Sequence, residues 1–315
     1  MRILVTGANG QLGHDVMNEL LLRGHDAIAS GSSPAYRGPA DGSPVTSAPF
    51  VKLDVTDPGD VAAVLSQIRP EALIHCSAWT AVDAAEDAEN RDKVYALNVL
   101  GPRNLAEACA SLGCRMMQIS TDYVFSGDGV EPWKPEQEAY QPINYYGETK
   151  LMGEKAVRSA VDKYFIVRTA WVFGFAGNNF VKTMLRLGET HDHLRVVNDQ
   201  IGTPTYTYDL ARLLADMIVT DKYGVYHATN EGGYISWYDF AQEIFRQAAA
   251  MGHEEYAPSR LAVEPVSTAE YGLSKAARPF NSRLDRSKLP EQGFEPLPDW
   301  RDALCRYLLE YYKER

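Results

Sequence analysis

Short apolar runs alternate with longer amphipathic stretches through the first half of the chain. Each apolar run has the length and composition of a strand buried on both faces. The runs lie at residues 3–5, 26–30, 50–55, 72–76, 116–119 and 165–169. Their alternation with helical segments predicts an α/β fold, in which helices cover both faces of a parallel sheet.

The helices are predicted from apolar residues that recur every three or four positions. Leu12, Val16 and Leu20 form one apolar face of the first helix. Asp57 and Pro58 supply an N-cap and a first-turn proline for a helix that runs through residue 68. Further helices are predicted at residues 94–112, 146–157 and 236–249.

The chain changes in character from residue 171 onward, where loops rich in Asn, Gly and Tyr separate short segments. We therefore expect a first domain at residues 1–170 and a smaller one at 171–315, with segments near 194–220 as candidates for a return to the first. Residues 31–49 are crowded with Gly, Pro and Ser. This composition predicts an irregular loop that is longer than most connections in compact domains.

Length and charge narrow the classes of function. A chain of 315 residues exceeds the usual size of one hydrophobic core, which agrees with two domains. The formal net charge of −11 opposes nucleic acids and anionic membranes as partners, because the summed field repels polyanions. No apolar run approaches the roughly 20 residues of a membrane helix. The first residues also lack a signal-peptide pattern, so we expect a cytoplasmic protein.

The four cysteines show neither a CxxC pair nor a zinc-like spacing. They lie in apolar or helical contexts, where cysteine usually behaves as a small hydrophobic residue. We expect Cys76, Cys109, Cys114 and Cys305 to be free thiols, and we expect no structural metal site.

Three glycines, Gly7, Gly10 and Gly13, follow the first predicted strand and open the first helix. Glycine permits a tight turn and a close backbone approach, while the unpaired amides and positive dipole of the helix start attract a pyrophosphate. Such a triplet can be a structural turn, but its place at the first strand-helix junction favours dinucleotide binding. The predicted fold is therefore a Rossmann-type doubly wound parallel sheet with a smaller α/β substrate-binding lobe.

The end of the second strand bears on the choice between NAD and NADP. An Asp or Glu there would bind the ribose of NAD, but the chain has Ser30, Gly31, Ser32 and Ser33, with Arg37 close behind. Without a carboxylate a 2′-phosphate is not repelled, and Ser or Arg side chains can bind it. Arg37 can also be a solvated charge in a flexible loop. The sequence therefore favours NADP(H) over NAD(H) only modestly.

Ligands of open α/β sheets bind outside the carboxyl ends of the strands. Asp54 and Val55 end the third strand, where they can flank the adenine, and Cys76, Ser77 and Ala78 end the fourth strand, near the nicotinamide ribose. Each of these residues can also be a packing residue. The expected cofactor-binding residues are Gly7, Asn9, Gly10, Gln11, Leu12, Gly13, Ser30, Arg37, Asp54, Val55, Cys76, Ser77, Ala78, Thr80, Asn98, Tyr146 and Lys150.

Tyr146 and Lys150 are four residues apart, so they lie on one face of a predicted helix. A neighbouring ammonium favours the phenolate, and we expect Lys150 and an oxidised nicotinamide together to lower the pKa of Tyr146 from its usual value of about 10. Thr121 ends a strand, and its hydroxyl can hydrogen-bond a substrate carbonyl. A YxxxK pair often arises by chance, and Thr121 can be a strand-end cap. Together, the three residues indicate proton transfer that accompanies hydride transfer.

The chain resembles the extended short-chain dehydrogenase/reductases, and within them most closely the reductases of dTDP-linked keto sugars. The resemblance runs nearly from end to end. Beyond the three glycines, the motifs that carry it are Ala78-Trp79-Thr80-Ala81-Val82-Asp83, Ser120-Thr121-Asp122-Tyr123-Val124-Phe125, Tyr145-Tyr146-Gly147-Glu148-Thr149-Lys150-Leu151, Arg168-Thr169-Ala170-Trp171-Val172-Phe173-Gly174, Gly177-Asn178-Asn179-Phe180, Asn198-Asp199-Gln200, Gly202-x-Pro204-Thr205 and Arg278-Pro279 followed by Asn281-Ser282-Arg283-Leu284.

The resemblance implies that NAD(P)H reduces the C4 ketone of dTDP-6-deoxy-L-lyxo-4-hexulose to give dTDP-L-rhamnose. By this resemblance Tyr146 donates the proton, Lys150 adjusts the pKa of Tyr146 and Thr121 polarises the ketone. Trp171 would pack against the sugar nucleotide, because its amphipathic ring suits a hexose face. The implied substrate-binding residues are Val82, Thr121, Asp122, Trp171, Asn179, Lys182 and Arg278, and the basic residues Lys182, Arg278 and Arg283 would counter the diphosphate.

Some features depart from the family or leave alternatives open. Trp79 stands where the family often has His, and Asp122 is followed by Tyr123 rather than by the Glu that dehydratases use for elimination. Another nucleotide-sugar reductase, an epimerase, and a non-catalytic NADP-binding regulatory subunit like that of methionine adenosyltransferase remain alternatives. Retention of the three proton-transfer residues favours an enzyme. The resemblance leaves magnesium open without assigning its ligands, and allows a monomer or a homodimer.

Overall fold

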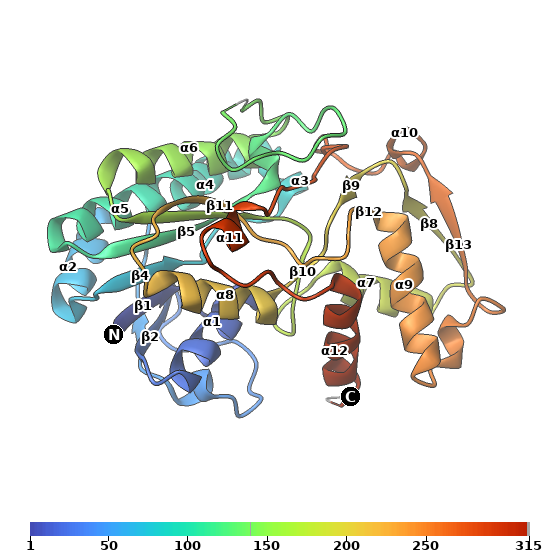
Figure 1. Ribbon diagram of the computed structural model, residues 1–315, viewed down its shortest axis with the longest axis horizontal. Coiled ribbons are helices and arrows are strands. Elements are labelled where there is room, and N and C mark those ends of the chain that lie inside the picture. Colours follow the sequence, from blue (N-terminus) through green and yellow to red (C-terminus); the bar gives the residue numbers. More distant parts are fainter. Residues whose placement is uncertain (139, 314–315) are drawn as a thin grey trace.

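The computed structural model describes residues 1–138 and 140–313. Two lobes lie side by side in Figure 1, the larger one built on a seven-stranded sheet. All strands of this sheet pair in parallel, in the order β11-β6-β5-β4-β1-β2-β3. The strands are β1 (Arg2–Thr6), β2 (Asp26–Gly31), β3 (Phe50–Lys52), β4 (Ala72–His75), β5 (Arg115–Thr121), β6 (Tyr164–Thr169) and β11 (Gly224–His227). The predicted Rossmann-type fold is confirmed.

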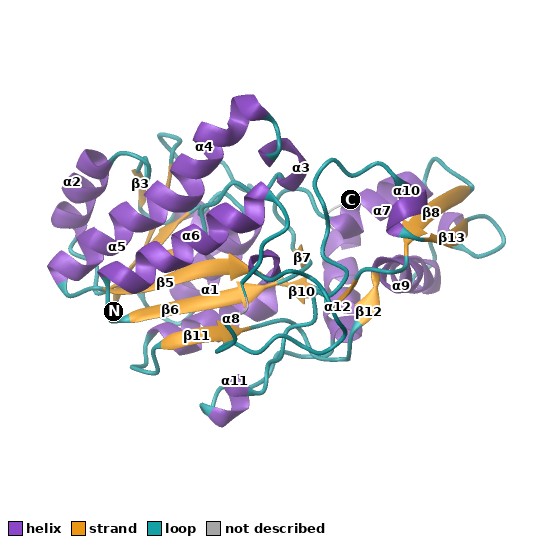
Figure 2. Cartoon of the chain, turned by 90° about the horizontal axis from the view of Figure 1, so that it is seen from above, coloured by secondary structure: helices purple, strands orange, loops and turns teal. Residues whose placement is uncertain are grey.

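Alternate side chains of the strands enter two separate cores, as the doubly wound fold requires. Ile3 and Val5 belong to the core under one set of helices, whereas Leu4 between them belongs to the core on the opposite face. The first face is covered by α1 (Gln11–Leu22) and α8 (Thr207–Ile218), and the second by α2 (Pro58–Ile68), α5 (Gly101–Leu112) and α6 (Tyr145–Ala160). Figure 2 shows α5 and α6 lying across the sheet.

The helix expected at residues 94–112 is interrupted. It consists of α4 (Arg91–Tyr95), a π-helical turn (Ala96–Leu100) and α5. The turn contains the buried Asn98, whose side chain accepts a hydrogen bond from the backbone nitrogen of Trp79 (2.9 Å) and donates one to its carbonyl (3.2 Å). A π-helical turn of this kind is frequent at functional sites, and here it connects α5 to the segment that follows β4.

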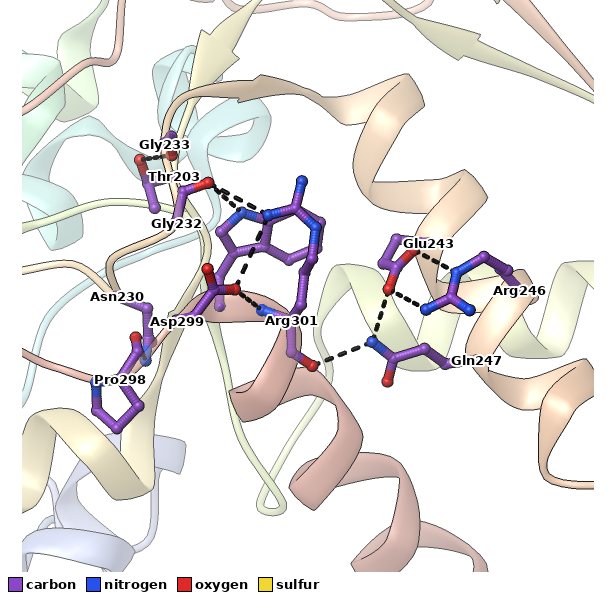
Figure 3. A network of polar contacts seen from close by, with 11 residues as sticks. Thr203, Asn230, Gly232, Gly233, Glu243, Arg246, Gln247, Pro298, Asp299 and Arg301 are labelled. Atoms are coloured by element: carbon purple, nitrogen blue, oxygen red, sulfur yellow. Dashed lines mark hydrogen bonds and ion pairs between the residues drawn. The ribbon is translucent and has the colours of Figure 1, made fainter.

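The smaller lobe has a core rich in aromatic residues, to which Phe173, Phe240, Trp300 and Tyr307 contribute. Its main helices are α7 (Phe180–Gly188), α9 (Trp237–Ala250) and α12 (Trp300–Lys313). A polar contact joins α9 to α12, where the Gln247 side chain donates to the Arg301 carbonyl (3.0 Å). Just before α12, the Pro298 carbonyl accepts a hydrogen bond from the Asn230 side chain (2.9 Å), and Figure 3 labels these residues.

Of the segments near 194–220 that were candidates for a return to the first domain, residues 194–197 do not return to it. This segment is β8 (His193–Val197), which pairs in parallel with β13 (Ala262–Val266), and its apolar side chains enter the aromatic-rich core. By contrast, α8 and β11 do lie in the larger lobe, where β11 forms an edge of the sheet. Two short ladders lie between the lobes: β7 (Val172–Phe173) with β10 (Thr205–Tyr206), and β9 (Ile201–Gly202) with β12 (Ile235–Ser236). The remaining short helices are α3 (Val82–Ala85), α10 (Thr268–Tyr271) and α11 (Lys288–Glu291).

The loop at residues 31–49 is held against α1. Tyr36 and the His14 ring are hydrogen-bonded at 2.5 Å, and Asn18 accepts a hydrogen bond from the Val45 nitrogen at 2.9 Å. A short 3₁₀ turn, Pro44–Ser47, lies within the loop. The loop is therefore an ordered extension of the first strand-helix unit. In the described part of the chain, no helix is long and apolar enough to cross a bilayer.

Candidate active site

A cleft of about 790 Å³ lies at the carboxyl ends of β1, β2, β4, β5 and β6 and reaches into the smaller lobe. This is the place where open α/β sheets bind ligands. It brings together most of the residues that the sequence singled out. Those lining the cleft are Gly7, Asn9, Gly10, Gln11, Leu12, Gly13, Asp54, Val55, Cys76, Ser77, Ala78, Thr80, Val82, Thr121, Asp122, Tyr146, Lys150 and Trp171.

The glycine-rich loop packs closely on itself and on the segment that follows β4. Gly7 has a φ of 71°, and a methyl group there would lie 2.7 Å from the Ser77 nitrogen, so only glycine fits. A methyl group at Gly13 would lie 2.1 Å from the Gly7 oxygen. The N-cap of α1 is Gly10, which has no side chain to cap the first amides. These amides face the cleft end of α1, and their positive dipole suits a pyrophosphate.

Three expected cofactor residues do not line the cleft. The Ser30 hydroxyl is buried and donates to the Val5 carbonyl (3.2 Å). Gly31 and Ser32 line the cleft in its place. Arg37 is exposed, and its backbone nitrogen donates to Asn9 Oδ1 (2.8 Å). Asn98 lies behind the cleft in the π-helical turn, and its side chain also donates to Thr149 on α6 (3.2 Å).

Thr121, Tyr146 and Lys150 meet at the end of β5 and the start of α6. The N-cap of α6 is Asn144, whose side chain accepts from the Gly147 nitrogen (2.8 Å) and so fixes where the helix begins. The Lys150 ammonium donates a hydrogen bond to the Ile119 carbonyl at 2.7 Å, which links α6 to β5. Tyr146 and Lys150 are 8% and 4% exposed, so their side chains lie in a largely desolvated corner of the cleft.

The pKa of Tyr146 is shifted upward in the protein itself, opposite in direction to the shift expected from Lys150 and an oxidised nicotinamide together. Burial raises the pKa of this phenol, nearby Asp122 adds to the effect, and the Thr121 hydroxyl opposes it. For Lys150, burial lowers the pKa to about 8, and Glu154 one turn along the helix opposes the change. Tyr146 therefore keeps its proton across the working range, while Lys150 is an ammonium that loses its charge in mild alkali.

Asp122 adds a carboxyl group to the same corner. It accepts a hydrogen bond from the Thr121 hydroxyl at 2.9 Å and is 2% exposed. Burial raises its pKa to about 6, and hydrogen bonds from Ser282 and Thr121 oppose this change. A carboxylate at neutral pH thus orients the Thr121 hydroxyl, whose own oxygen remains an acceptor toward the cleft.

The structure separates the other expected substrate residues into two groups. Val82 and Trp171 line the cleft. The basic side chains have protein partners instead: Lys182 donates to the carbonyls of Phe175 and Gly177, and Arg278 pairs with Asp83 at 2.8 Å.

Asn179 and Arg283 also have structural partners. Asn179 is the N-cap of α7, where it accepts from the Lys182 nitrogen, and its side chain donates to Gln11 Oε1 at 3.0 Å. Arg283 donates to Asn281 Oδ1 at 3.0 Å. Asn179 thus touches the dinucleotide loop from the smaller lobe, although it does not line the cleft itself.

Sequence reasoning missed several lining residues. Those on strand ends could have been inferred from the position of the strands, and Asn178 and Phe180 from the motif that contains them. Trp237 had no signal beyond its place at the start of a predicted helix. The missed residues are Gly31, Ser32, Leu53, Leu97, Ile119, Ser120, Tyr123, Thr169, Ala170, Val172, Gly177, Asn178, Phe180 and Trp237.

The described residues contain no group of three or more His, Cys, Asp or Glu side chains that could hold a metal ion. All four cysteines are free, as expected, and Cys76 lies at the cleft. Burial raises the pKa of its thiol to about 12, so it is not a thiolate at neutral pH.

Comparison with known proteins gives a consistent result. The family described as RmlD substrate binding domain matches residues 1–313. A dTDP-4-dehydrorhamnose reductase of Streptomyces griseus is 41% identical over 310 residues, which cover 96% of this chain and 91% of that protein.

Two solved structures agree over nearly their whole length. The dTDP-4-dehydrorhamnose reductase ortholog from Clostridium acetobutylicum superimposes with a TM-score of 0.86 at 40% identity, covering 99% of this chain and 100% of that one. The dTDP-4-dehydrorhamnose reductase from Bacillus anthracis, solved in complex with NADP, has a TM-score of 0.84 at 40% identity and covers 98% and 99%.

Proposed function

Since the chain belongs to the RmlD substrate binding domain family, we propose that it is a dTDP-4-dehydrorhamnose reductase. It uses NAD(P)H to reduce the C4 ketone of dTDP-6-deoxy-L-lyxo-4-hexulose to dTDP-L-rhamnose. The observation that carries this proposal is the meeting of Thr121, Tyr146 and Lys150 in one cleft with the glycine-rich loop. Because all three proton-transfer residues are in place, the enzyme is favoured over a non-catalytic regulatory subunit.

The residues present fit a dinucleotide. The start of α1 offers uncapped amides to the pyrophosphate, and the absence of a side chain at Gly7 lets the loop before α1 pack against the Ser77 backbone. Asp54 and Val55 line the cleft at the expected adenine position, and Lys150 can hold the nicotinamide ribose. When bound, the reduced nicotinamide supplies the hydride that C4 accepts.

Tyr146 delivers the proton to the ketone oxygen. Its raised pKa keeps the phenol protonated, which is the form that a reduction consumes. As negative charge develops on the ketone oxygen, that oxygen becomes basic enough to take the phenolic proton. When the substrate binds, the ketone oxygen can replace Asp122 as the acceptor of the Thr121 hydroxyl, and the Lys150 ammonium stabilises the phenolate that remains.

We retain NADP(H) as the favoured cofactor. Gly31 and Ser32 line the cleft at the end of β2 in place of a carboxylate, and the ordered loop that follows carries Ser33 and Arg37. Asn9 supports this arrangement by donating to the Ser33 hydroxyl (3.1 Å) and accepting from the Arg37 nitrogen. These features suit a 2′-phosphate and offer no repulsion to it.

We also propose that the two lobes bind different ligands. The first 170 residues together with α8 and β11 hold the dinucleotide, and the rest of the chain receives the sugar nucleotide. Val82 and Trp171 contact the sugar nucleotide at the boundary of the lobes.

The direct test is oxidation of NADPH and of NADH in the presence of enzymatically prepared dTDP-6-deoxy-L-lyxo-4-hexulose, with a cofactor-only control. Substrate-dependent oxidation with NADPH preferred is expected. Binding of NADPH without oxidation would contradict the proposed reaction, and equal rates with both cofactors would contradict the proposed preference.

A further inference from the structure

The backbone of Trp171 is strained. Its φ is 51°, and Arg69 is the other non-glycine residue with positive φ in the described ranges. Such a conformation is unfavourable for a residue with a side chain and persists only where the surroundings enforce it, most often at functional sites. Here the Trp171 carbonyl accepts from the Thr205 nitrogen at 3.1 Å, and the next residue, Val172, pairs with Thr205 in the β7–β10 ladder.

The strained backbone turns the Trp171 indole onto a second indole. The rings of Trp171 and Trp237 are stacked, with centroids 3.7 Å apart and planes at 14°, and both side chains line the cleft. Phe180 packs against Trp237 with centroids 4.5 Å apart. These three rings form an aromatic platform, contributed by the segment before β7, by α7 and by α9.

Gly202 leaves the space that the Trp171 indole occupies. A methyl group on Gly202 would lie 2.7 Å from Cε2, 2.9 Å from Nε1 and 3.0 Å from Cζ2 of Trp171. These distances are shorter than real carbon contacts, so any side chain at position 202 would displace the ring. The clash is with a rigid ring on a constrained backbone, which has little freedom to move away.

One segment positions both indoles. In β9, Gly202 pairs with Ile235 of β12, two residues before Trp237, and in β10 Thr205 pairs with Val172, directly after Trp171. Thr203 between them donates to the Gly233 carbonyl at 3.1 Å (Figure 3). A capping box at Ser236 fixes the start of α9 and with it the Trp237 side chain. The relative placement of the two rings is therefore built into the backbone.

We propose that Gly202 and Trp237 are specificity-determining residues, which hold the Trp171 indole in place as part of a platform for the apolar face of the 6-deoxyhexose. The location supports a sugar rather than the adenine, since Trp171 follows Thr169, which pairs in register with Thr121 at the reacting end of the cleft. Aromatic rings suit the C–H face and the methyl group of a deoxy sugar. This inference rests on the proposed function.

The test compares Gly202→Ala, Trp237→Ala and Trp237→Phe with the wild type. Closely stacked indoles give an exciton couplet in far-ultraviolet circular dichroism, which we expect in the wild type and expect to be lost in Gly202→Ala and both Trp237 variants. We expect KM for the sugar nucleotide to rise about tenfold in Gly202→Ala and Trp237→Ala, and less in Trp237→Phe. KM for NADPH should not change. Tyr238→Phe, the next residue on α9, removes a hydroxyl that bonds Gln242 and should change neither signal.

A double variant distinguishes an effect of Gly202→Ala on the Trp171 indole from an effect on strand β9, which carries Gly202. In a Trp171→Phe background the smaller ring leaves room for a methyl group, so Gly202→Ala should add little to KM. An equal rise in KM in both backgrounds would overturn the inference, as would an active wild type without the couplet. Absence of turnover in the wild type would instead contradict the proposed function, whereas the couplet and its loss in Gly202→Ala would still report on the indole pair.

Discussion

At the scale of single residues, Tyr146 is the position where sequence and structure together say most about chemistry. The spacing to Lys150 was enough to place both side chains on one helix face, and the structure confirms that placement. It could not reveal the pKa, because this depends on burial beneath residues such as Tyr123, whose ring packs edge-on against Tyr146 with centroids 5.5 Å apart. Burial keeps the phenol protonated, which is the state that the proposed proton donor needs.

We predict that Tyr146→Phe lowers kcat by about 10²–10⁴-fold, the usual contribution of a general acid, while NADPH still binds. The reason is that the change removes the transferable proton and little volume. Steady-state rates and a fluorescence titration with NADPH measure the two effects. Tyr145→Phe is the matched control, because the adjacent hydroxyl bonds the Arg91 carbonyl outside the cleft. Near-normal rates in Tyr146→Phe would exclude Tyr146 as the donor.

Lys150 predicts a pH dependence. Its pKa of about 8 means that the ammonium is present below pH 8 and lost above it. Because the raised pKa of Tyr146 keeps the phenol from titrating there, kcat/KM should fall about tenfold per pH unit above 8. Lys150→Met should be slow and should lack this alkaline limb, whereas Lys155→Met, an exposed residue of the same helix, should keep the wild-type profile. An unchanged limb in Lys150→Met would assign the titration to another group.

The basic residues show where residue-level reasoning from sequence fails. Arg278 was expected at the diphosphate, but it pairs with Asp83, which is 195 positions away in the chain. The ammonium of Lys182 is bound by carbonyls of the preceding turn. Sequence spacing identifies partners on one helix or at neighbouring strand ends, whereas pairs that form only through tertiary contacts leave no local pattern.

At the scale of elements, the link between the glycine-rich loop and α7 was not visible in the sequence. Gln11 donates to the Asn178 carbonyl at 3.2 Å and accepts from the Asn179 side chain at 3.0 Å. Both Gln11 and Asn178 line the cleft. The first helix of the dinucleotide fold and the first helix of the smaller lobe are thus joined across the cofactor region.

This link predicts that Gln11→Ala weakens NADPH binding by about fivefold to tenfold, the usual worth of one or two hydrogen bonds. Most of the change should appear in the dissociation rate, as is usual when a single contact of a binding site is removed. Stopped-flow displacement of NADPH measures that rate. Gln67→Ala, an exposed residue of α2, is the control. A dissociation rate unchanged by Gln11→Ala would show that the contact does not retain the cofactor.

At the scale of the whole molecule, the order of strands and helices in the first 170 residues could be predicted because each element has its own periodicity. The path of the chain after that point could not. β11 completes the large sheet and α8 covers it, although residues 194–197 just before them pair with β13 in the smaller lobe. Short strands of two residues, such as β9 and β10, carry no periodicity from which their partners could be inferred.

The junction of α1, α8 and α12 concentrates negative charge. Burial raises the pKa of Asp15 on α1 to about 7, and the carboxylates of Glu310, Asp41 and Asp209 add to the effect, while the Thr207 hydroxyl opposes it. Glu310 belongs to α12 and hydrogen-bonds Tyr206, so the cluster lies where the C-terminal helix meets the larger lobe. The folded protein therefore binds a proton at Asp15 more tightly than the unfolded chain does.

The sign of the resulting pH dependence follows from linkage. Between pH 4 and pH 7 the unfolded chain has released the Asp15 proton and the folded protein has not, so the free energy of unfolding falls as pH rises through this window. Above pH 7 Asp15 is deprotonated in both states, and its charge lowers the free energy of unfolding by its full amount. Asp15→Asn removes this penalty, so the variant should be more stable than the wild type by about 4 kcal/mol at pH 8 and by about 1 kcal/mol at pH 4.5. Urea unfolding at both pH values measures the difference, with the exposed Asp162→Asn as the control. An equal effect of Asp15→Asn at both pH values would mean that the amide acts through packing, and that the junction tolerates its buried charge without cost.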